Sequence, residues 1–304
     1  MKTLPDVVSS SGPEVIRLRS RQLEVEVAPG LGGRIVQIRH LDSGHEFLWN
    51  NAGLTLAAQP PGSPYDSNFY GGIDELIPND IPETIDGVAC PDHGELWTSP
   101  LDWHLEEDTL FLRGRLPRFG LAYERRMTLR HDSPVIDLHY RIANKSEAVR
   151  HFLWKHHAAM TVATGDVIDC PARKAQVVDL TYSRFDWLSP FSWPEIEGQQ
   201  ANIVPAKNNT VDFFYLFDLA EGRIAWARPS QRTKFEYRFD TSVFPFVWLF
   251  ASYGGFDGHY TVVLEPCTAM PMSVNDAIAN GRCSQLGPGE VLETDVSIYA
   301  GPFE

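Results

Sequence analysis

Apolar and polar side chains alternate along much of the chain. In the segment 121–130, Leu121, Tyr123, Met127 and Leu129 share one face, with polar residues between them. A period of two is typical of strands with one buried face, because successive side chains of an extended chain point to opposite sides. The same pattern predicts further strands at residues 23–27, 34–39, 46–49, 109–115, 135–142, 151–154, 213–218, 223–227, 235–239, 247–252, 260–265 and 294–299.

Long helices are not expected. No window carries a 3.6-residue apolar stripe beyond two turns, and 23 Gly and 22 Pro residues interrupt the chain. Many short strands with frequent turns favour a sandwich or a barrel. We therefore predict an all-β fold, a large antiparallel β-sandwich. No linker divides the chain, so we expect one domain over residues 1–304, with residues 1–20 as an N-terminal extension or edge segment.

One segment, residues 55–88, departs from the alternating pattern. It is rich in Pro, Gly, Asp and Asn, and its part 68–79 also carries aromatic residues. Loops of this length inside compact domains are usually functional or disordered. The aromatic residues and glycines favour an ordered loop.

Composition and charge make several classes of protein improbable. The 304 residues are 43% hydrophobic and 22% charged, as in ordinary soluble proteins, and the net charge is −14. A surface this acidic repels phosphate backbones and anionic lipids, so we expect neither a nucleic-acid nor a membrane partner. No run of about 18 apolar residues occurs, and residues 1–12 lack the apolar core of a secretory signal. Four scattered cysteines suggest reduced thiols in a cytoplasmic protein.

Three short clusters carry candidate chemistry. His93 precedes a glycine and a nearby tryptophan, His156 and His157 follow an apolar run, and Glu265 ends a strongly apolar run before a proline. Each has a plain structural interpretation, because buried polar groups usually have ordinary hydrogen-bond partners. A His-Gly step is usually a turn, a His pair beside Trp usually packs, and a Glu before Pro usually ends a strand.

The order of the motifs along the chain favours a functional interpretation over these structural ones. In chain order they are Gly32-Gly33-Arg34, the Gly-x-Asp-Glu-x-x-Pro segment 72–78, His93-Gly94 with Trp97, His157-Ala158-Ala159-Met160, and Glu265-Pro266. This ordered set, from about residue 22 to 300, resembles the aldose 1-epimerase (galactose mutarotase-like) superfamily, in particular its divergent branches. The resemblance implies a galactose mutarotase-like β-sandwich that interconverts the α and β anomers of a free sugar.

The sequence also departs from the familiar galactose mutarotases. Their early loop has an Asn-Arg pair where this chain has Asn68-Phe69-Tyr70, and their central Asn-His-x-Tyr-Phe motif is replaced by Lys155-His156-His157-Ala158. No position matches the sugar-contacting aspartate of the family. The resemblance therefore does not name galactose as the substrate.

The resemblance implies general acid–base ring opening without a metal or another cofactor. A base removes the proton of the C1 hydroxyl while an acid protonates the ring oxygen O5. The motifs assign Glu265 as the base, His157 as the acid and His93 as a donor to a sugar oxygen. We expect burial to raise the pKa of Glu265, and a neighbouring carboxylate to raise that of His157. Only one of His156 and His157 can face the cleft, and the Ala-Ala-Met that follows favours His157.

Sugar recognition would use carboxylates and arginine for the hydroxyls and flat aromatic rings for the C–H faces. The candidate substrate-binding residues are Arg34, Asp74, Glu75, Trp97, Trp248 and His156, together with Phe69 and Tyr70. Trp248 could equally belong to the core and Arg34 to the surface. No Lys/Arg cluster lies near the motifs, which favours a neutral monosaccharide over a phosphorylated one. A monomer and a homodimer both remain open.

Three alternatives also remain open. The first is a non-catalytic sugar-binding or regulatory protein on the same fold. The second is a glycoside-acting hydrolase or lyase, in which Glu265 would face Asp74 or Glu75 across the bond. The third is a metal-dependent isomerase or hydrolase. Its candidate ligands are His93, His156 or His157, His259 and Glu265.

Overall fold

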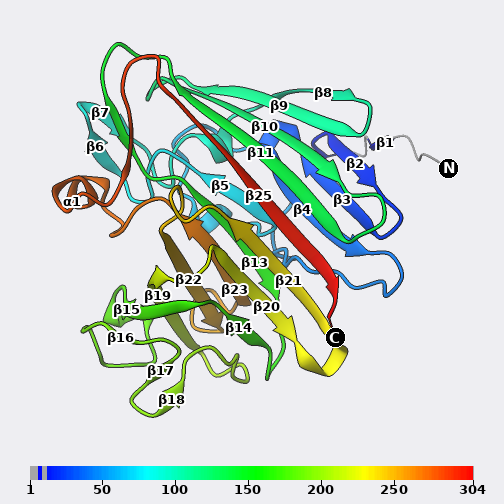
Figure 1. The fold of residues 1–304 in the computed structure, drawn as a ribbon, viewed down its shortest axis with the longest axis vertical. Coiled ribbons are helices and arrows are strands. Elements are labelled where there is room, and N and C mark those ends of the chain that lie inside the picture. The colour runs from blue at the N-terminus through cyan, green and yellow to red at the C-terminus, as the bar shows by residue number, and fades with distance from the viewer. Residues whose placement is uncertain (1–5, 9–11, 304) are drawn as a thin grey trace.

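The computed structural model describes residues 6–8 and 12–303. Nearly all of the regular structure in this part of the chain is antiparallel β (Figure 1), which confirms the predicted fold class. Residues 1–5 and 9–11, which belong to the segment expected not to be a secretory signal, lie outside the described residues. Within residues 6–8 and 12–303, helical structure is limited to α1 (Val274–Ala279) and the 3₁₀ turns Pro29–Leu31, Asp66–Asn68, Leu96–Thr98, Leu180–Tyr182 and Pro229–Gln231.

Over the described part of the chain, the larger sheet has 11 strands in the order β1-β2-β3-β4-β5-β13-β23-β22-β19-β15-β16. Segments distant in sequence meet at its centre, where β5 pairs with β13 and β13 pairs with β23. The bounds in spatial order are β1 (Asp6–Val8), β2 (Val15–Arg19), β3 (Leu23–Ala28), β4 (Arg34–His40), β5 (Ile73–Leu76), β13 (Lys155–Thr161), β23 (Tyr260–Cys267), β22 (Phe246–Tyr253), β19 (Thr210–Leu219), β15 (Ala172–Val177) and β16 (Phe191–Ser192).

The smaller sheet has 8 strands, and the long C-terminal strand β25 runs through its middle between β21 and β11 (Figure 1). Alternating apolar residues from both sheets form one buried cluster, which includes Ile38, Tyr140, Leu264 and Ile298. The bounds in spatial order are β14 (Val167–Asp169), β20 (Arg223–Arg228), β21 (Thr233–Phe239), β25 (Val291–Pro302), β11 (Val135–Asn144), β10 (Leu121–Leu129), β9 (Thr109–Leu116) and β8 (Asp102–Glu106).

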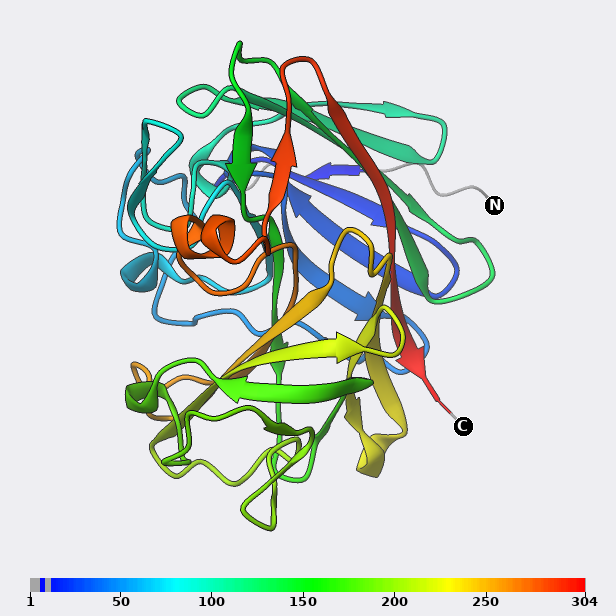
Figure 2. The ribbon, with the colours of Figure 1, turned by 60° about the vertical axis from the view of Figure 1, so that its left-hand side comes forward.

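Short strand pairs and α1 lie outside the two large sheets. Figure 2 shows α1 beside the connecting loops at one side of the sandwich. Ser273 caps α1 by accepting a hydrogen bond from the Asp276 amide, as a serine at this position commonly does. The Glu83 carboxylate accepts from the Val274 amide at 2.6 Å, so α1 is held to β6. The pairs are β6 (Glu83–Ile85) with β7 (Val88–Cys90), β12 (Arg150–Phe152) with β24 (Ser284–Leu286), and β17 (Glu195–Ile196) with β18 (Gln199–Gln200).

Two parts of the expected strand pattern were wrong. Residues 46–49 form only isolated bridges, such as Leu48 with Met160, rather than a strand. The segment 55–88, expected to be a loop, contributes β5 to the middle of the larger sheet. All four residues of β5 are buried, so both of its faces are covered and the alternation that marks a half-exposed strand is absent.

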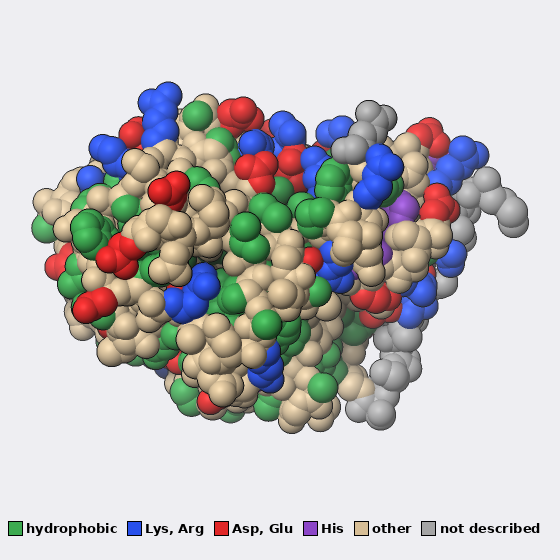
Figure 3. Space-filling view, turned by 90° about the horizontal axis from the view of Figure 1, so that it is seen from below, with side chains coloured by type: hydrophobic (Ala, Val, Ile, Leu, Met, Phe, Trp, Pro, Cys, Tyr) green, Lys and Arg blue, Asp and Glu red, His purple; other side chains and the backbone are tan. Residues whose placement is uncertain are grey.

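Charge on the molecular surface is mixed. Figure 3 shows Lys and Arg side chains interspersed with Asp and Glu on the face seen from below. All four cysteines are free thiols, as their scattered positions suggested. Across the residues that the structure describes, no helix has the length and apolar character needed to cross a membrane.

Candidate functional site

A cleft with a volume of about 270 Å³ opens on one face of the larger sheet. It lies on the side away from the smaller sheet, because His156 packs on Tyr140 and Tyr237 of that sheet and its strand neighbour His157 points the other way. Ligand pockets start at roughly 300 Å³. The cleft therefore suits a single small ligand such as a monosaccharide.

The three residues predicted to be catalytic all line this cleft. In the pairing of β13 with β23, Lys155 lies opposite Cys267 and Ala158 opposite Leu264, so the register sets His157 beside Glu265. His93 reaches the cleft from the connection between β7 and β8. Residues far apart in sequence are thus brought together by the sheet and by one loop that crosses it.

A buried ammonium lies at the floor of the cleft. The Lys155 Nζ is 2.7 Å from Asp80 Oδ1 and 2.6 Å from Glu265 Oε2, and these three side chains are at most 6% exposed. Burial alone would lower the pKa of Lys155, but the two carboxylates raise it above its ordinary value, so the ammonium stays charged. Burial raises the pKa of Glu265 against the opposing effect of Lys155, in the direction expected from the sequence.

Sequence reasoning missed both Lys155 and Asp80. The available signal was polar residues at alternate positions, 155 and 157, of an otherwise apolar strand. Trp248, one of the predicted sugar contacts, is fully buried beneath the ammonium, with its ring centroid 4.5 Å from the Lys155 Nζ. It does not line the cleft, so its role is in the core.

His157 differs from expectation in its electrostatics. Its Nδ1 lies 3.2 Å from the hydroxyl oxygen of Tyr65, and no carboxylate takes that place. Burial lowers the pKa of His157 well below its ordinary value, and the positive charge of Lys155 acts in the same direction. The expectation that a carboxylate raises this pKa was therefore wrong, and His157 is neutral near pH 7.

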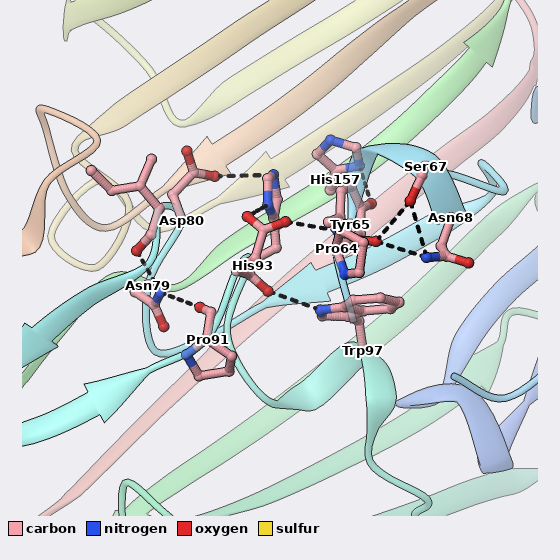
Figure 4. Close-up of polar contacts among 12 residues, drawn as sticks. Pro64, Tyr65, Ser67, Asn68, Asn79, Asp80, Pro91, His93, Trp97 and His157 are labelled. Carbon is pink, nitrogen blue, oxygen red and sulfur yellow. Dashed lines mark hydrogen bonds and ion pairs between the residues drawn. The ribbon is translucent and has the colours of Figure 1, made fainter. Parts of the chain in front are cut away.

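His93 lies between two carboxylates. Its Nδ1 is 2.8 Å from Asp92 Oδ1, and its Nε2 is 3.6 Å from Asp80 Oδ1 (Figure 4). The turn that presents it requires Gly94, whose φ is +77° and where a Cβ would lie 2.2 Å from the Ile77 carbonyl oxygen. The His-Gly step is thus a turn, as its plain interpretation held, and this turn places the imidazole in the cleft.

Three predicted sugar contacts lie behind the cleft wall instead. Asp74 and Arg34 form an ion pair, Nε to Oδ1 at 2.7 Å, behind Tyr65. Trp97 packs its ring edge-on against Tyr65 and donates from Nε1 to the carbonyl oxygen of Asp92 (Figure 4). None of the three lines the cleft, so the expectation of direct sugar contact was wrong for them. They hold the residues that do line it.

Glu75 and His156 point into the core between the sheets, so their prediction as substrate-binding residues was also wrong. The Glu75 carboxylate accepts hydrogen bonds from Arg125, Tyr123, Tyr140 and Trp154 at 2.8 to 3.1 Å. The physical reason is strand alternation: Glu75 pairs with His156 and Asp74 with His157, and each pair occupies its own face. This placement excludes a hydrolase site that pairs Glu265 with Glu75. Asp74 shares the face of His157, but it is ion-paired with Arg34 and does not line the cleft.

His156 gives a testable dependence of stability on pH. Burial lowers its pKa to about 4, and within the described chain neither ring nitrogen has a hydrogen-bond partner. Because this histidine in the unfolded chain titrates near 6.5, the unfolded chain binds more protons than the folded chain between pH 6.5 and 4, and acid destabilises the folded protein. We expect the free energy of unfolding to include about 3 kcal/mol above pH 6.5 that depends on His156 being neutral. This part should be lost progressively as the pH falls to 4.

Urea unfolding of the wild type and of His156→Phe at pH 8, 6, 5 and 4 measures this contribution. The wild type should lose more unfolding free energy than the variant across this range, because Phe cannot bind the proton. Equal pH dependence of the two proteins would contradict the assignment.

Aromatic rings form the remaining wall of the cleft, and the residues are Tyr65, Phe69, Tyr182, Phe213, Phe250 and Phe256. His259, a candidate metal ligand from sequence, packs against Trp49 with ring centroids 4.8 Å apart. Within residues 6–8 and 12–303, no three His, Cys, Asp or Glu side chains converge as a metal site would require. The proposed ligand set is therefore not assembled.

Comparison with protein-family models and with curated protein sequences finds no match. Solved structures do match over nearly the whole chain. A Synechocystis sp. PCC 6803 protein has a TM-score of 0.75 at 16% identity, covering 100% of both chains. A galactose mutarotase-like protein from Clostridium acetobutylicum has a TM-score of 0.73 at 15% identity, covering 99% of both chains. A galactose mutarotase related enzyme from Lactobacillus acidophilus has a TM-score of 0.69 at 12% identity, covering 94% of this chain and 97% of its own. The chain therefore has the galactose mutarotase-like β-sandwich fold.

Proposed function

We propose that this chain is an aldose 1-epimerase-like isomerase, which interconverts the α and β anomers of a free monosaccharide. The observation that supports this most is the convergence of Glu265, His157 and His93 in one cleft of monosaccharide size. One carboxylate and two imidazoles supply both a proton acceptor and a proton donor, which is what anomer exchange requires.

In the proposed reaction, Glu265 removes the proton from the C1 hydroxyl, and an imidazole gives a proton to O5. The C1–O5 bond breaks to leave an open-chain aldehyde. Rotation about C1–C2 presents the other face of the carbonyl group, and the ring closes with the proton flow reversed. The catalyst is regenerated without any cofactor. The raised pKa of Glu265 strengthens it as a base, and the Lys155 ammonium fixes the position of its carboxylate.

The walls of the cleft support a neutral sugar. Phe69, Phe213 and Phe250 offer flat faces for C–H groups. The carboxylates that line the cleft belong to Asp66, Asp80, Asp92, Asp179 and Glu265, whereas Lys155 is the one lysine or arginine among the described residues that line it. Such an excess of negative charge repels a phosphorylated sugar.

Polarimetry on freshly dissolved α-anomers of neutral hexoses and pentoses tests the proposal. We expect the protein to accelerate the approach to anomeric equilibrium for at least one neutral sugar, and to leave hexose 6-phosphates at their uncatalysed rate. Boiled protein serves as the control.

No acceleration for any sugar, combined with heat released on sugar binding in calorimetry, would instead favour a non-catalytic sugar-binding protein. New reducing ends from oligosaccharides would favour a hydrolase. A cytoplasmic location and a monomeric or homodimeric state remain predictions.

A further inference from the structure

A continuous line of buried polar contacts runs from Arg34 to His157. The Arg34 Nε lies 2.7 Å from Asp74 Oδ1, Asp74 Oδ2 lies 2.7 Å from the Tyr65 hydroxyl, and that hydroxyl lies 3.2 Å from His157 Nδ1. The four residues are between 2% and 7% exposed. The line uses both oxygens of Asp74 and ends at one nitrogen of the imidazole in the cleft.

The chemistry of the line fixes where each proton lies. Arg34 is always a donor, so the carboxylate of Asp74 beside it acts as the acceptor. Burial raises the pKa of Tyr65 well above its ordinary value, so its phenol keeps its proton. That proton is given to Asp74 at 2.7 Å. The Tyr65 oxygen then has only lone pairs left for His157, and the Nδ1 of His157 must be the donor.

We propose that Tyr65, held by Asp74 and Arg34, is a positioning residue that fixes His157 as the Nδ1–H tautomer, with Nε2 as a hydrogen-bond acceptor in the cleft. The inference rests on the proposed function and changes which histidine gives the proton to O5. His157 accepts from a sugar hydroxyl, so it does not donate the proton to O5.

The donor role then belongs to His93. Carboxylate oxygens are acceptors, and both nitrogens of His93 face one: Asp92 at 2.8 Å and Asp80 at 3.6 Å. The Nδ1 of His93 is thereby held by Asp92, and its Nε2, which lies beyond hydrogen-bond distance from Asp80, is the nitrogen left to act on O5. Tyr65 also stacks on His93 with ring centroids 4.1 Å apart and meets His157 edge-on at 5.5 Å, so one ring orients both imidazoles (Figure 4).

Nitrogen NMR tests the tautomer directly, without any need for activity. Long-range ¹H–¹⁵N spectra of the full chain at pH 7.5 separate the two neutral forms of a histidine, and His157→Gln assigns the signal. We expect the Nδ1–H form in the wild type. An Nε2–H form would overturn the proposal, because the protons of the line would then run the opposite way.

Two variants change the line at different points. Tyr65→Phe removes the hydroxyl oxygen that accepts from His157 Nδ1, and we expect the His157 signal to shift towards the Nε2–H form. In Asp74→Asn, the amide donates to the Tyr65 oxygen, so Tyr65 gives its own proton to His157 Nδ1 and the Nε2–H form should dominate. Tyr182→Phe, which removes a hydroxyl from the same cleft, should leave the His157 signal unchanged. A His157 signal that stays unchanged in both line variants would refute the proposal.

Kinetics separates this inference from the proposed function. On a sugar that the wild type converts, Tyr65→Phe should lower kcat by about 10- to 100-fold, as loss of a partner that orients a histidine commonly does, with a smaller change in KM. An unchanged kcat would contradict the positioning role. If no sugar is converted while the wild-type spectrum shows the Nδ1–H form, the proposed function fails and the tautomer assignment stands.

Discussion

Replacing Glu265 by Gln should slow anomer interconversion by about 10²- to 10⁴-fold, the usual contribution of a general base. The amide has the shape of the carboxylate but cannot take the proton of the C1 hydroxyl. The Lys155 ammonium keeps Asp80 as a partner at 2.7 Å, so the floor of the cleft should remain assembled. Polarimetry measures the rate, and calorimetric titration should show that sugar affinity changes much less than the rate.

A matched variant on the surface controls for the loss of one negative charge. Glu293 is 57% exposed, pairs with Arg141 and lies outside the cleft, so Glu293→Gln should keep the wild-type rate. Full activity of Glu265→Gln would remove this residue from the mechanism. An equal loss of sugar affinity and of interconversion rate would show that Glu265 binds the sugar but does not take the proton of its C1 hydroxyl.

Replacing Lys155 by Met should lower the free energy of unfolding by about 3–5 kcal/mol, the range for removal of one partner from a buried ion pair. Asp80 and Glu265 would then face each other inside the protein without the cation that compensates them. Chemical denaturation at pH 7.5 measures the loss. It should shrink at lower pH, where the two carboxylates can share a proton.

Two further variants sharpen this result. The Nζ of Lys234 lies 3.0 Å from Glu236 at a more exposed site, so Lys234→Met should cost only about 0–1 kcal/mol. Adding Asp80→Asn and Glu265→Gln to Lys155→Met should recover much of the lost stability, because the buried charges disappear. A triple variant as unstable as Lys155→Met alone would point to lost packing against Trp248 as the cause.

The alternation of apolar and polar residues was sufficient to predict the strands that have one solvated face. β10 and β11, for example, begin at Leu121 and Val135, where the pattern placed them. It failed at β5 and β13, which lie side by side in the middle of the larger sheet and are covered on both faces. In these two strands, the charged residues are buried instead of facing solvent. The local pattern of apolar and polar residues cannot distinguish such a strand from a loop.

The candidate site was predictable only in part. Motif order selected Glu265, His157 and His93, and all three line the cleft. The sequence could not assign faces within β5, where adjacent Asp74 and Glu75 serve different sides of the sheet. Nor could it show that Lys155 meets Asp80 and Glu265, because this contact depends on how three distant segments pair.

Polar residues at the floor of the cleft and Tyr182 in its wall come from separable parts of the chain. Lys155, His157 and Glu265 belong to two adjacent strands, whereas Tyr182 belongs to the long connection between β15 and β19. Mutation can lengthen, shorten or rewrite that connection without disturbing the register of the strands. Diversification of ligand preference could therefore proceed by loop exchange over an unaltered floor, and chimaeras that graft this connection offer a practical route to new specificities.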